Sequence, residues 1–141
     1  MTDYLTTFRT RLLHAEALVD LARSQRTQAE AGDYDGLIDS LTRKGRIIDR
    51  MGEAVSESFT TQWRLDREHL SDAVRQECEL LLDRAEQCLD ETLDHERAAI
   101  ATVTTARQTV QTELTSLTQG RQSVRGYGPT SPPTSRIDLA S

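Results

Sequence analysis

Apolar residues recur every three or four positions from residue 5 to residue 29. The series is Leu5, Phe8, Leu12, Ala15, Val19, Ala22, Arg26 and Ala29, with Arg26 as its one charged member. This spacing places a narrow apolar stripe along one side of an α-helix, and such a stripe needs a second helix to cover it. The pattern therefore predicts a helix over residues 3–30.

A short turn is predicted directly after this first helix. Gly32 readily adopts the left-handed conformation that ends a helix, and the side chain of Asp33 can cap the next one. The same spacing then resumes and predicts a second helix over residues 33–60, which forms an antiparallel hairpin with the first. Its expected inner stripe is Tyr34, Leu37, Leu41, Lys44, Ile48, Met51 and Val55.

The pattern is blurred over residues 60–64, which predicts a second turn. Asp66 is the expected cap of a third helix over residues 67–119. Its stripe is Val74, Cys78, Leu81, Ala85, Cys88 and Thr92, continued by Ala99, Val103, Ala106, Val110, Leu114 and Leu117. At the usual rise this helix is about 80 Å long, twice the length of the hairpin.

The second half of the third helix is therefore expected to lack a covering partner within the chain. It is also rich in threonine, which loses side-chain freedom in a helix and makes this half intrinsically weak. The alternative is a kink near residues 93–97 that folds the helix back, although no Pro or Gly occurs there to cause one.

Residues 120–141 are rich in Gly, Pro and Ser and are predicted to form a disordered tail. Within it, Tyr127 and the segment 137–139 are candidates for short recognition segments that order on binding, or are parts of an ordinary solvated terminus. The expected fold is all-α, an antiparallel hairpin with a long third helix in a three-helix, coiled-coil-like bundle. The helical domain covers residues 1–119 and the tail covers residues 120–141.

Composition narrows the functional classes. The 141 residues are 36% hydrophobic, 28% charged and only 4% aromatic, which suits a thin helical bundle. A net charge of −6 disfavours nucleic-acid binding. The longest aliphatic run, residues 80–82, is far too short for stable membrane insertion, and the first residues lack the features of a signal peptide. We therefore expect a cytoplasmic protein.

The two cysteines, Cys78 and Cys88, are expected to be small buried apolar groups. Ten residues on one helix separate them by about 15 Å, too far for a disulfide.

Candidate catalytic and metal-binding groups are sparse. The three histidines, His14, His69 and His95, lack the surroundings of a phosphotransfer site. A di-iron bundle needs repeated Glu-x-x-His pairs, and the nearest match here, residues 66–69, is single and begins with Asp. Glu91 and His95 are four residues apart and can reach one metal ion together, but we expect both side chains to lie on a solvent-exposed helix face without a metal. We therefore expect no enzymatic activity, no cofactor and no metal.

Three segments carry a resemblance to a known family. They are the turn Gly32-Asp33-Tyr34-Asp35-Gly36-Leu37, the pattern of residues 41–48, and Tyr127-Gly128-Pro129 after a long last helix. Over about residues 5–129 the chain resembles the FlgN-type flagellar export chaperones, with the FliT type a close second. It departs from the family at residues 93–97, where members often carry Asn, and in its longer tail.

The resemblance implies a chaperone that binds the C-terminal helices of flagellar hook-associated proteins at the hook–filament junction and delivers them to the type III export gate. Tyr127 is the implied contact with the export-gate protein. The implied client-binding residues lie on the uncovered stripe and are Ile100, Val103, Ala106, Val110, Leu114 and Leu117. An uncovered stripe suits an amphipathic partner helix, and until a client binds it can be covered by self-association in a homodimer.

A second hypothesis stays open from the sequence. A coiled-coil structural or scaffolding protein without an exported client has the same apolar periodicity, and its third-helix stripe is permanently buried in a stable oligomer.

Overall fold

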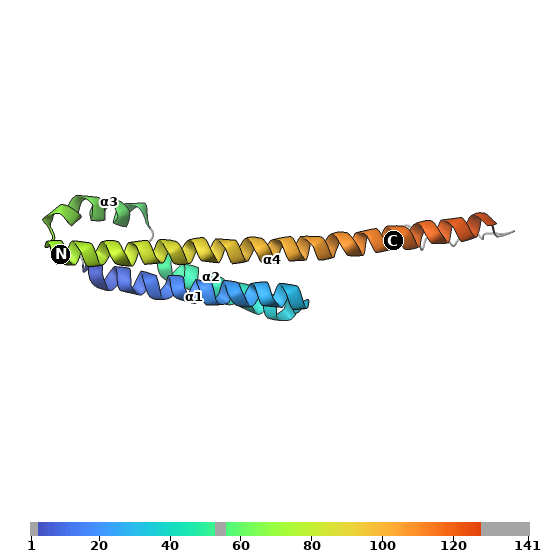
Figure 1. Cartoon of the computed structure of the whole chain (residues 1–141), viewed down its shortest axis with the longest axis horizontal. Helices are drawn as coiled ribbons and strands as arrows, with labels where there is room; N and C mark the ends of the chain where they lie inside the picture. The colour runs from blue at the N-terminus through green and yellow to red at the C-terminus, as the bar shows by residue number, and fades with distance from the viewer. Residues whose placement is uncertain (1–2, 53–55, 128–141) are drawn as a thin grey trace. The chain divides into compact units, whose positions relative to one another are not determined.

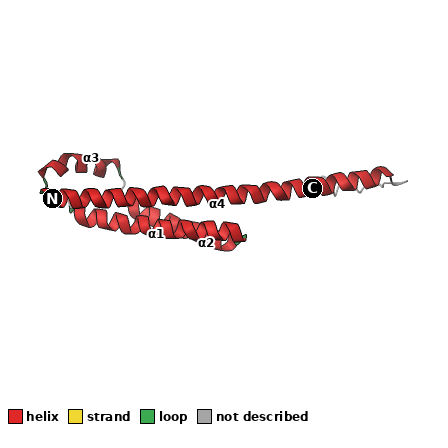
Figure 2. Cartoon of the chain, in the orientation of Figure 1, coloured by secondary structure: helices red, strands yellow, loops and turns green. Residues whose placement is uncertain are grey.

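The computed structural model describes residues 3–52 and 56–127, with side chains up to residue 123, and within these ranges it is all-α (Figures 1 and 2). Its helices are α1 (Tyr4–Ala31), α2 (Tyr34–Met51), α3 (Glu57–Asp66), the 3-10 helix η2 (Arg67–His69) and α4 (Asp72–Tyr127). The all-α prediction is confirmed. The chain divides into two units, residues 1–102 and 103–141, which we describe separately.

The turn between α1 and α2 follows the prediction. Gly32 adopts a φ of 69°, and its N–H bonds back to the carbonyl of Ala29. The carboxylate of Asp33 accepts a hydrogen bond from the Gly36 N–H at 3.0 Å. It lies so close to Gly36 that a Cβ there would require the Asp33 side chain to shift.

The predicted second helix over 33–60 is instead two helices. Met51 is the last residue of α2, and α3 begins after Ser56, whose hydroxyl accepts from the Phe59 N–H at 3.2 Å. Residues 60–64, expected as a turn, lie inside α3. A serine cap and the spacing of Phe59 and Trp63 on one face of α3 account for a helix here.

The predicted third helix begins later than expected. Asp66 is the last residue of α3, and the Ser71 hydroxyl accepts from the Val74 N–H at the start of α4. The helix then continues without interruption through residues 93–97, so the kink weighed as an alternative is not observed.

A cluster of four aromatic side chains joins α1 and α3. Tyr4, Phe8, Phe59 and Trp63 have ring centroids 5.0–6.1 Å apart, mostly in edge-to-face or tilted arrangements. The fully buried Cys78 of α4 lies in the same cluster. Four of the six aromatic residues of the chain are therefore concentrated at one site, where α3 is attached.

A seam of small residues joins α1 to the part of α4 in the first unit. Figure 1 shows the two helices running side by side in the same direction. Buried positions repeat every seven residues on both helices, with an offset of 70 positions. They are Phe8, Ala15, Ala22 and Ala29 on α1, and Cys78, Ala85, Thr92 and Ala99 on α4. Because most of these side chains are small, the two backbones can approach closely.

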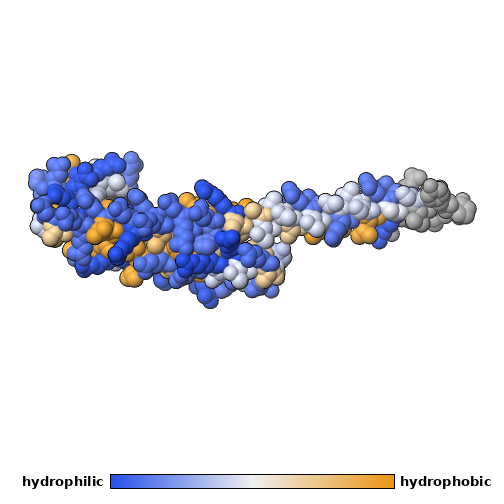
Figure 3. All heavy atoms as spheres, in the orientation of Figure 1, coloured by the Kyte–Doolittle hydropathy of each residue, from blue (hydrophilic) through white to orange (hydrophobic). Residues whose placement is uncertain are grey.

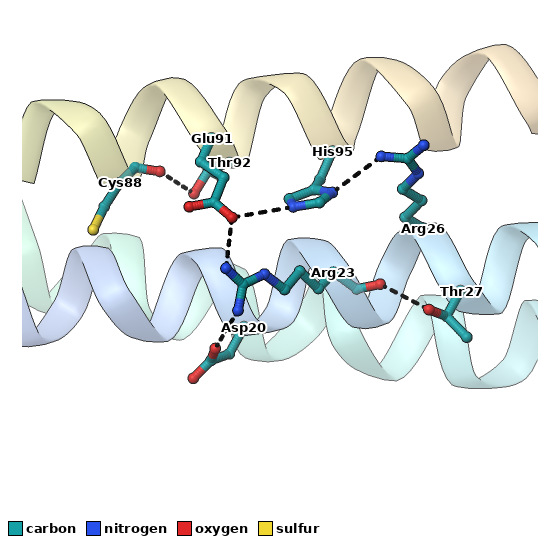
Figure 4. A network of polar contacts seen from close by, with 8 residues as sticks. All are labelled: Asp20, Arg23, Arg26, Thr27, Cys88, Glu91, Thr92 and His95. Atoms are coloured by element: carbon teal, nitrogen blue, oxygen red, sulfur yellow. Dashed lines mark hydrogen bonds and ion pairs between the residues drawn. The ribbon is translucent and has the colours of Figure 1, made fainter.

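Ion pairs repeat along the flank of this seam. Arg9 bonds Glu77 and Arg23 bonds Glu91, each at 2.6 Å. Figure 4 shows Glu91 also contacting His95, whose other ring nitrogen lies 3.5 Å from Arg26. The hydrogen bond from Arg23 lowers the pKa of Glu91. These pairs are half exposed, so they specify the register of α1 and α4 more than they stabilise the fold.

The other side of α1 contacts α2. The side chain of Gln28 contacts the buried Ser40 hydroxyl at 2.9 Å, and its amide nitrogen donates to that hydroxyl and to the backbone carbonyls of Gly36 and Ser24. Lys44 of α2 forms an ion pair with Glu96, which connects α2 to α4.

The two cysteines do not pair with each other, as predicted. Cys78 is buried and Cys88 is half buried, and burial raises the pKa of both thiols. Both groups are therefore small apolar side chains of the bundle interior rather than reactive thiolates.

In the second unit, α4 continues to Tyr127. Residues 120–127, expected as the start of the tail, are thus helical. The rest of the predicted tail, including Ile137 and Leu139, lies outside the described residues. None of the helices in the described ranges is long and apolar enough to cross a membrane.

Candidate protein-binding surface

The second unit carries an exposed apolar stripe, which we call the α4 stripe. It consists of Val103, Ala106, Val110, Leu114 and Leu117, whose positions fall within an arc of roughly 80° on the helix. Val110, Leu114 and Leu117 are 54–65% exposed, whereas Val103 and Ala106 are half buried. Among the described side chains of residues 103–123, none is buried.

The surroundings of the α4 stripe are polar but nearly uncharged. Residues 103–123 contain three charged side chains, Arg107, Glu113 and Arg121, and otherwise mostly Thr, Gln and Ser. By helical geometry Arg107 and Glu113 flank the stripe on opposite sides. Figure 3 shows the result over this unit, where pale and blue atoms surround patches of orange apolar atoms. The surface is therefore an apolar stripe with one basic and one acidic position at its flanks.

The helix that carries the stripe is weak by itself. Thr109, Thr112, Thr115 and Thr118 each donate to the backbone carbonyl four residues earlier, at 2.9–3.1 Å. Such bonds compete with the helical ladder and slightly destabilise it. A helix that buries none of its side chains gains little stability from packing, so this segment is expected to be less stable than the packed part of α4.

The remaining predicted site residues lie outside this group. Ile100 belongs to the first unit, where its side chain is 66% exposed. Tyr127 is the last residue of α4, and its side chain lies outside the described residues. Five of the six predicted client-binding residues thus share one surface of the second unit.

A second exposed apolar surface, on α2, was missed by the sequence reasoning. This α2 face consists of Tyr34, Ile38, Leu41 and Ile48, which are 48–62% exposed. Three of them were expected inside the bundle and are not. The buried side of α2 carries Met51 and the half-buried Leu37 and Lys44, which were expected there, together with Ser40 and the half-buried Ile47, which were not. The signal lay in the adjacent pairs Leu37-Ile38 and Ile47-Ile48, because one narrow stripe cannot hold two neighbouring residues.

The described residues offer no evident chemical centre. Within residues 3–52 and 56–127, no group of three or more His, Cys, Asp or Glu side chains is placed to hold a metal ion. Glu91 and His95, the one pair considered from the sequence, instead take part in the polar contacts between α1 and α4. The features that remain are two apolar surfaces suited to binding protein.

Comparisons with models of protein families, with curated proteins and with solved structures found no match to this chain.

Proposed function

We propose that this chain is a cytoplasmic export chaperone that holds an amphipathic helix of an unfolded client on the α4 stripe. The observation that carries the proposal is the exposure of Val110, Leu114 and Leu117 on one face of a helix that needs a partner. An apolar stripe without cover is the surface that helix-in-groove recognition uses.

The size of the α4 stripe sets the size of its ligand. Val103 and Leu117 are about 21 Å apart along the helix, which is two heptads. A client helix of about 15 residues with apolar residues at matching intervals covers it completely. An acidic residue of the client helix placed opposite Arg107, and a basic residue of the client helix placed opposite Glu113, orient it on the stripe.

The chain resembles the FlgN-type chaperones, with the FliT type a close second, and this resemblance specifies the class of client. On this proposal the clients are the C-terminal helices of the hook-associated proteins at the hook–filament junction, and the chaperone delivers them to the type III export gate. Tyr127 is proposed as the contact with the gate protein. Its position after the α4 stripe leaves the stripe free for the client.

A double substitution on the stripe tests the proposal. Val110→Asp with Leu114→Asp puts two charges where the client packs, whereas Gln108→Asp with Thr112→Asp puts the same charges on the opposite face of the same helix. Burying an aliphatic side chain contributes about 1.5–3 kcal/mol, so the first variant should bind a hook-associated C-terminal peptide at least about 100-fold more weakly.

The second variant serves as the matched control, because it adds the same two charges at the same four-residue spacing. It should bind the peptide about as well as the unsubstituted chain, with both proteins equally helical by circular dichroism. Equal binding by the two variants would show that the α4 stripe is not the client site.

A further inference from the structure

The α2 face continues onto α4 across the ion pair between Lys44 and Glu96. Apolar residues lie three positions before and four positions after each partner of this pair, namely Leu41 and Ile48 on α2, and Leu93 and Ile100 on α4. Residues at these spacings share one side of a helix, so all four lie beside the contact between the two helices. Their side chains are 45–66% exposed. The α2 face together with Leu93 and Ile100 therefore forms one exposed apolar surface, which we call the α2–α4 surface.

The α2–α4 surface has the spacing and the open space that a further helix needs. Gly45 lies between Leu41 and Ile48 on the same side of α2, and a Cβ added to it would meet no atom within 4 Å. A large side chain of another helix can therefore approach the α2 backbone closely at this point. Along α2 the surface extends from Tyr34 to Ile48, about 21 Å, which matches a helix of about 15 residues.

The edges of the α2–α4 surface are mostly acidic. Four carboxylates border it by helical geometry, namely Asp35 and Asp49 on α2, and Glu86 and Asp90 on α4. None of the four forms an ion pair within the described part of the chain. Arg46 also lies at this edge, whereas Arg43 and Arg97 are each paired with an aspartate of their own helix. The edges therefore attract Lys and Arg side chains.

We propose that the α2–α4 surface is a second docking site, which takes an amphipathic helix of another protein with Lys or Arg along both edges of its apolar side. Charge disfavours a second copy of this chain as the occupant, because a symmetric pair brings the acidic edges of both copies to one interface. None of the residues of this surface belongs to the α4 stripe. The proposal is therefore independent of the proposed function and of its client.

Binding of two defined peptides to the full chain tests the charge of the partner. The probe is a helical peptide of about 15 residues with Leu along one side and Lys at both edges, and its control carries Glu in place of each Lys. Fluorescence anisotropy at low ionic strength measures both. The lysine peptide should bind, and the glutamate peptide should bind at least about 10-fold more weakly.

A pair of double substitutions tests the location of the site. Leu41→Gln with Ile100→Gln removes two apolar side chains from the surface without a change of charge. Leu13→Gln with Leu80→Gln makes the same change at two comparably exposed residues on other sides of α1 and α4. The first variant should bind the lysine peptide at least about 10-fold more weakly than the unsubstituted chain, because it loses apolar contact, and the second should bind it equally well.

Each other outcome overturns the proposal. Equal binding of the lysine peptide by the two variants, or no binding by the unsubstituted chain, rejects the α2–α4 surface as the site. Equal binding of the two peptides rejects the basic partner. A dimer of the unsubstituted chain in light scattering that Leu41→Gln with Ile100→Gln abolishes would make a second copy the occupant. Capture of a hook-associated C-terminal peptide by the first variant is a separate result, which reports only on the α4 stripe.

Discussion

At the scale of single residues, two glutamines on α1 show how much a buried amide depends on its partner. Gln25 is only 3% exposed, and its amide nitrogen has no hydrogen-bond partner among the described residues. Gln28, three residues later, is hydrogen-bonded to the buried hydroxyl of Ser40. A buried donor without a partner costs free energy, whereas a bonded one does not.

We therefore expect opposite effects from the same substitution at these two positions. Gln25→Met should stabilise the chain by about 1 kcal/mol, because it removes an unpaired amide at nearly constant volume. Gln28→Met should destabilise it by about 1–3 kcal/mol, because Ser40 loses its partner. Urea unfolding followed by circular dichroism measures both. A loss of stability in Gln25→Met would mean that this amide has a partner in solution.

Asp66 makes the stability of the chain depend on pH. Its carboxylate accepts a 2.6 Å hydrogen bond from the Tyr4 hydroxyl and further bonds from Gln62, and these bonds lower its pKa. The unfolded pKa is about 3.9, so the folded state gains stability from this group above that pH. This stabilisation is lost as the pH falls through the lowered pKa that Asp66 has in the folded state.

The expected result is a chain that loses stability between about pH 5 and pH 3, with a smaller loss in Asp66→Asn. Trp63 is the single tryptophan and lies in the adjacent aromatic cluster, so its fluorescence follows unfolding directly. If both proteins lose the same free energy of unfolding over this range, Asp66 is not a source of the dependence.

At the scale of elements, the bundle depends on the seam of small residues between α1 and α4. Ala22 is 1% exposed on α1 and belongs to this seam, whereas Ala101 is exposed on α4 within the same unit. A larger side chain can be accommodated at Ala101. It cannot be accommodated at Ala22, because a close-packed seam has no space for it.

Ala22→Leu should therefore destabilise the chain by about 1–3 kcal/mol, the usual cost of overfilling a core. Ala101→Leu, which adds the same atoms to the solvent-facing side, should change stability by less than about 0.5 kcal/mol. Thermal or urea unfolding distinguishes them. Equal stability of the two variants would show that α1 and α4 are not closely packed at Ala22.

The elements that could be predicted from the sequence were those with local chemical signals. Gly32 and Asp33 are adjacent and have specific roles at helix ends, so the bounds of α1 and the start of α2 were close to the observed ones. The stripes of α1 and of the first part of α4 follow a nearly regular heptad spacing, and their members are buried or half buried except for Arg26.

The separate helix α3 was missed because its main stabilising contacts are distant in sequence. Phe59 and Trp63 pack on Tyr4 and Phe8, more than 50 residues earlier, and no local pattern reveals that contact. The threonines at positions 60 and 61 suggested a turn, yet tertiary packing overrides such weak preferences.

At the scale of the whole chain, two exposed apolar surfaces compete for the role of client site. The α4 stripe could be predicted because its heptad spacing extends past the length that the first two helices can cover. The α2 face was missed, because the pairs Leu37-Ile38 and Ile47-Ile48 indicate two apolar sides of α2 but not which side is turned toward α1 and α4. The proposed function assigns the client to the α4 stripe and gives the α2 face no part in it.

Hydrogen–deuterium exchange on the full chain, with and without a hook-associated C-terminal peptide, tests this assignment most directly. Because the helix over residues 103–117 is weak alone, its amides should exchange readily in dilute chain and slow markedly when the peptide is bound. Residues 34–48 should be unchanged. If the peptide binds and instead slows exchange in α2, while residues 103–117 exchange as before, the α4 stripe is not the docking surface.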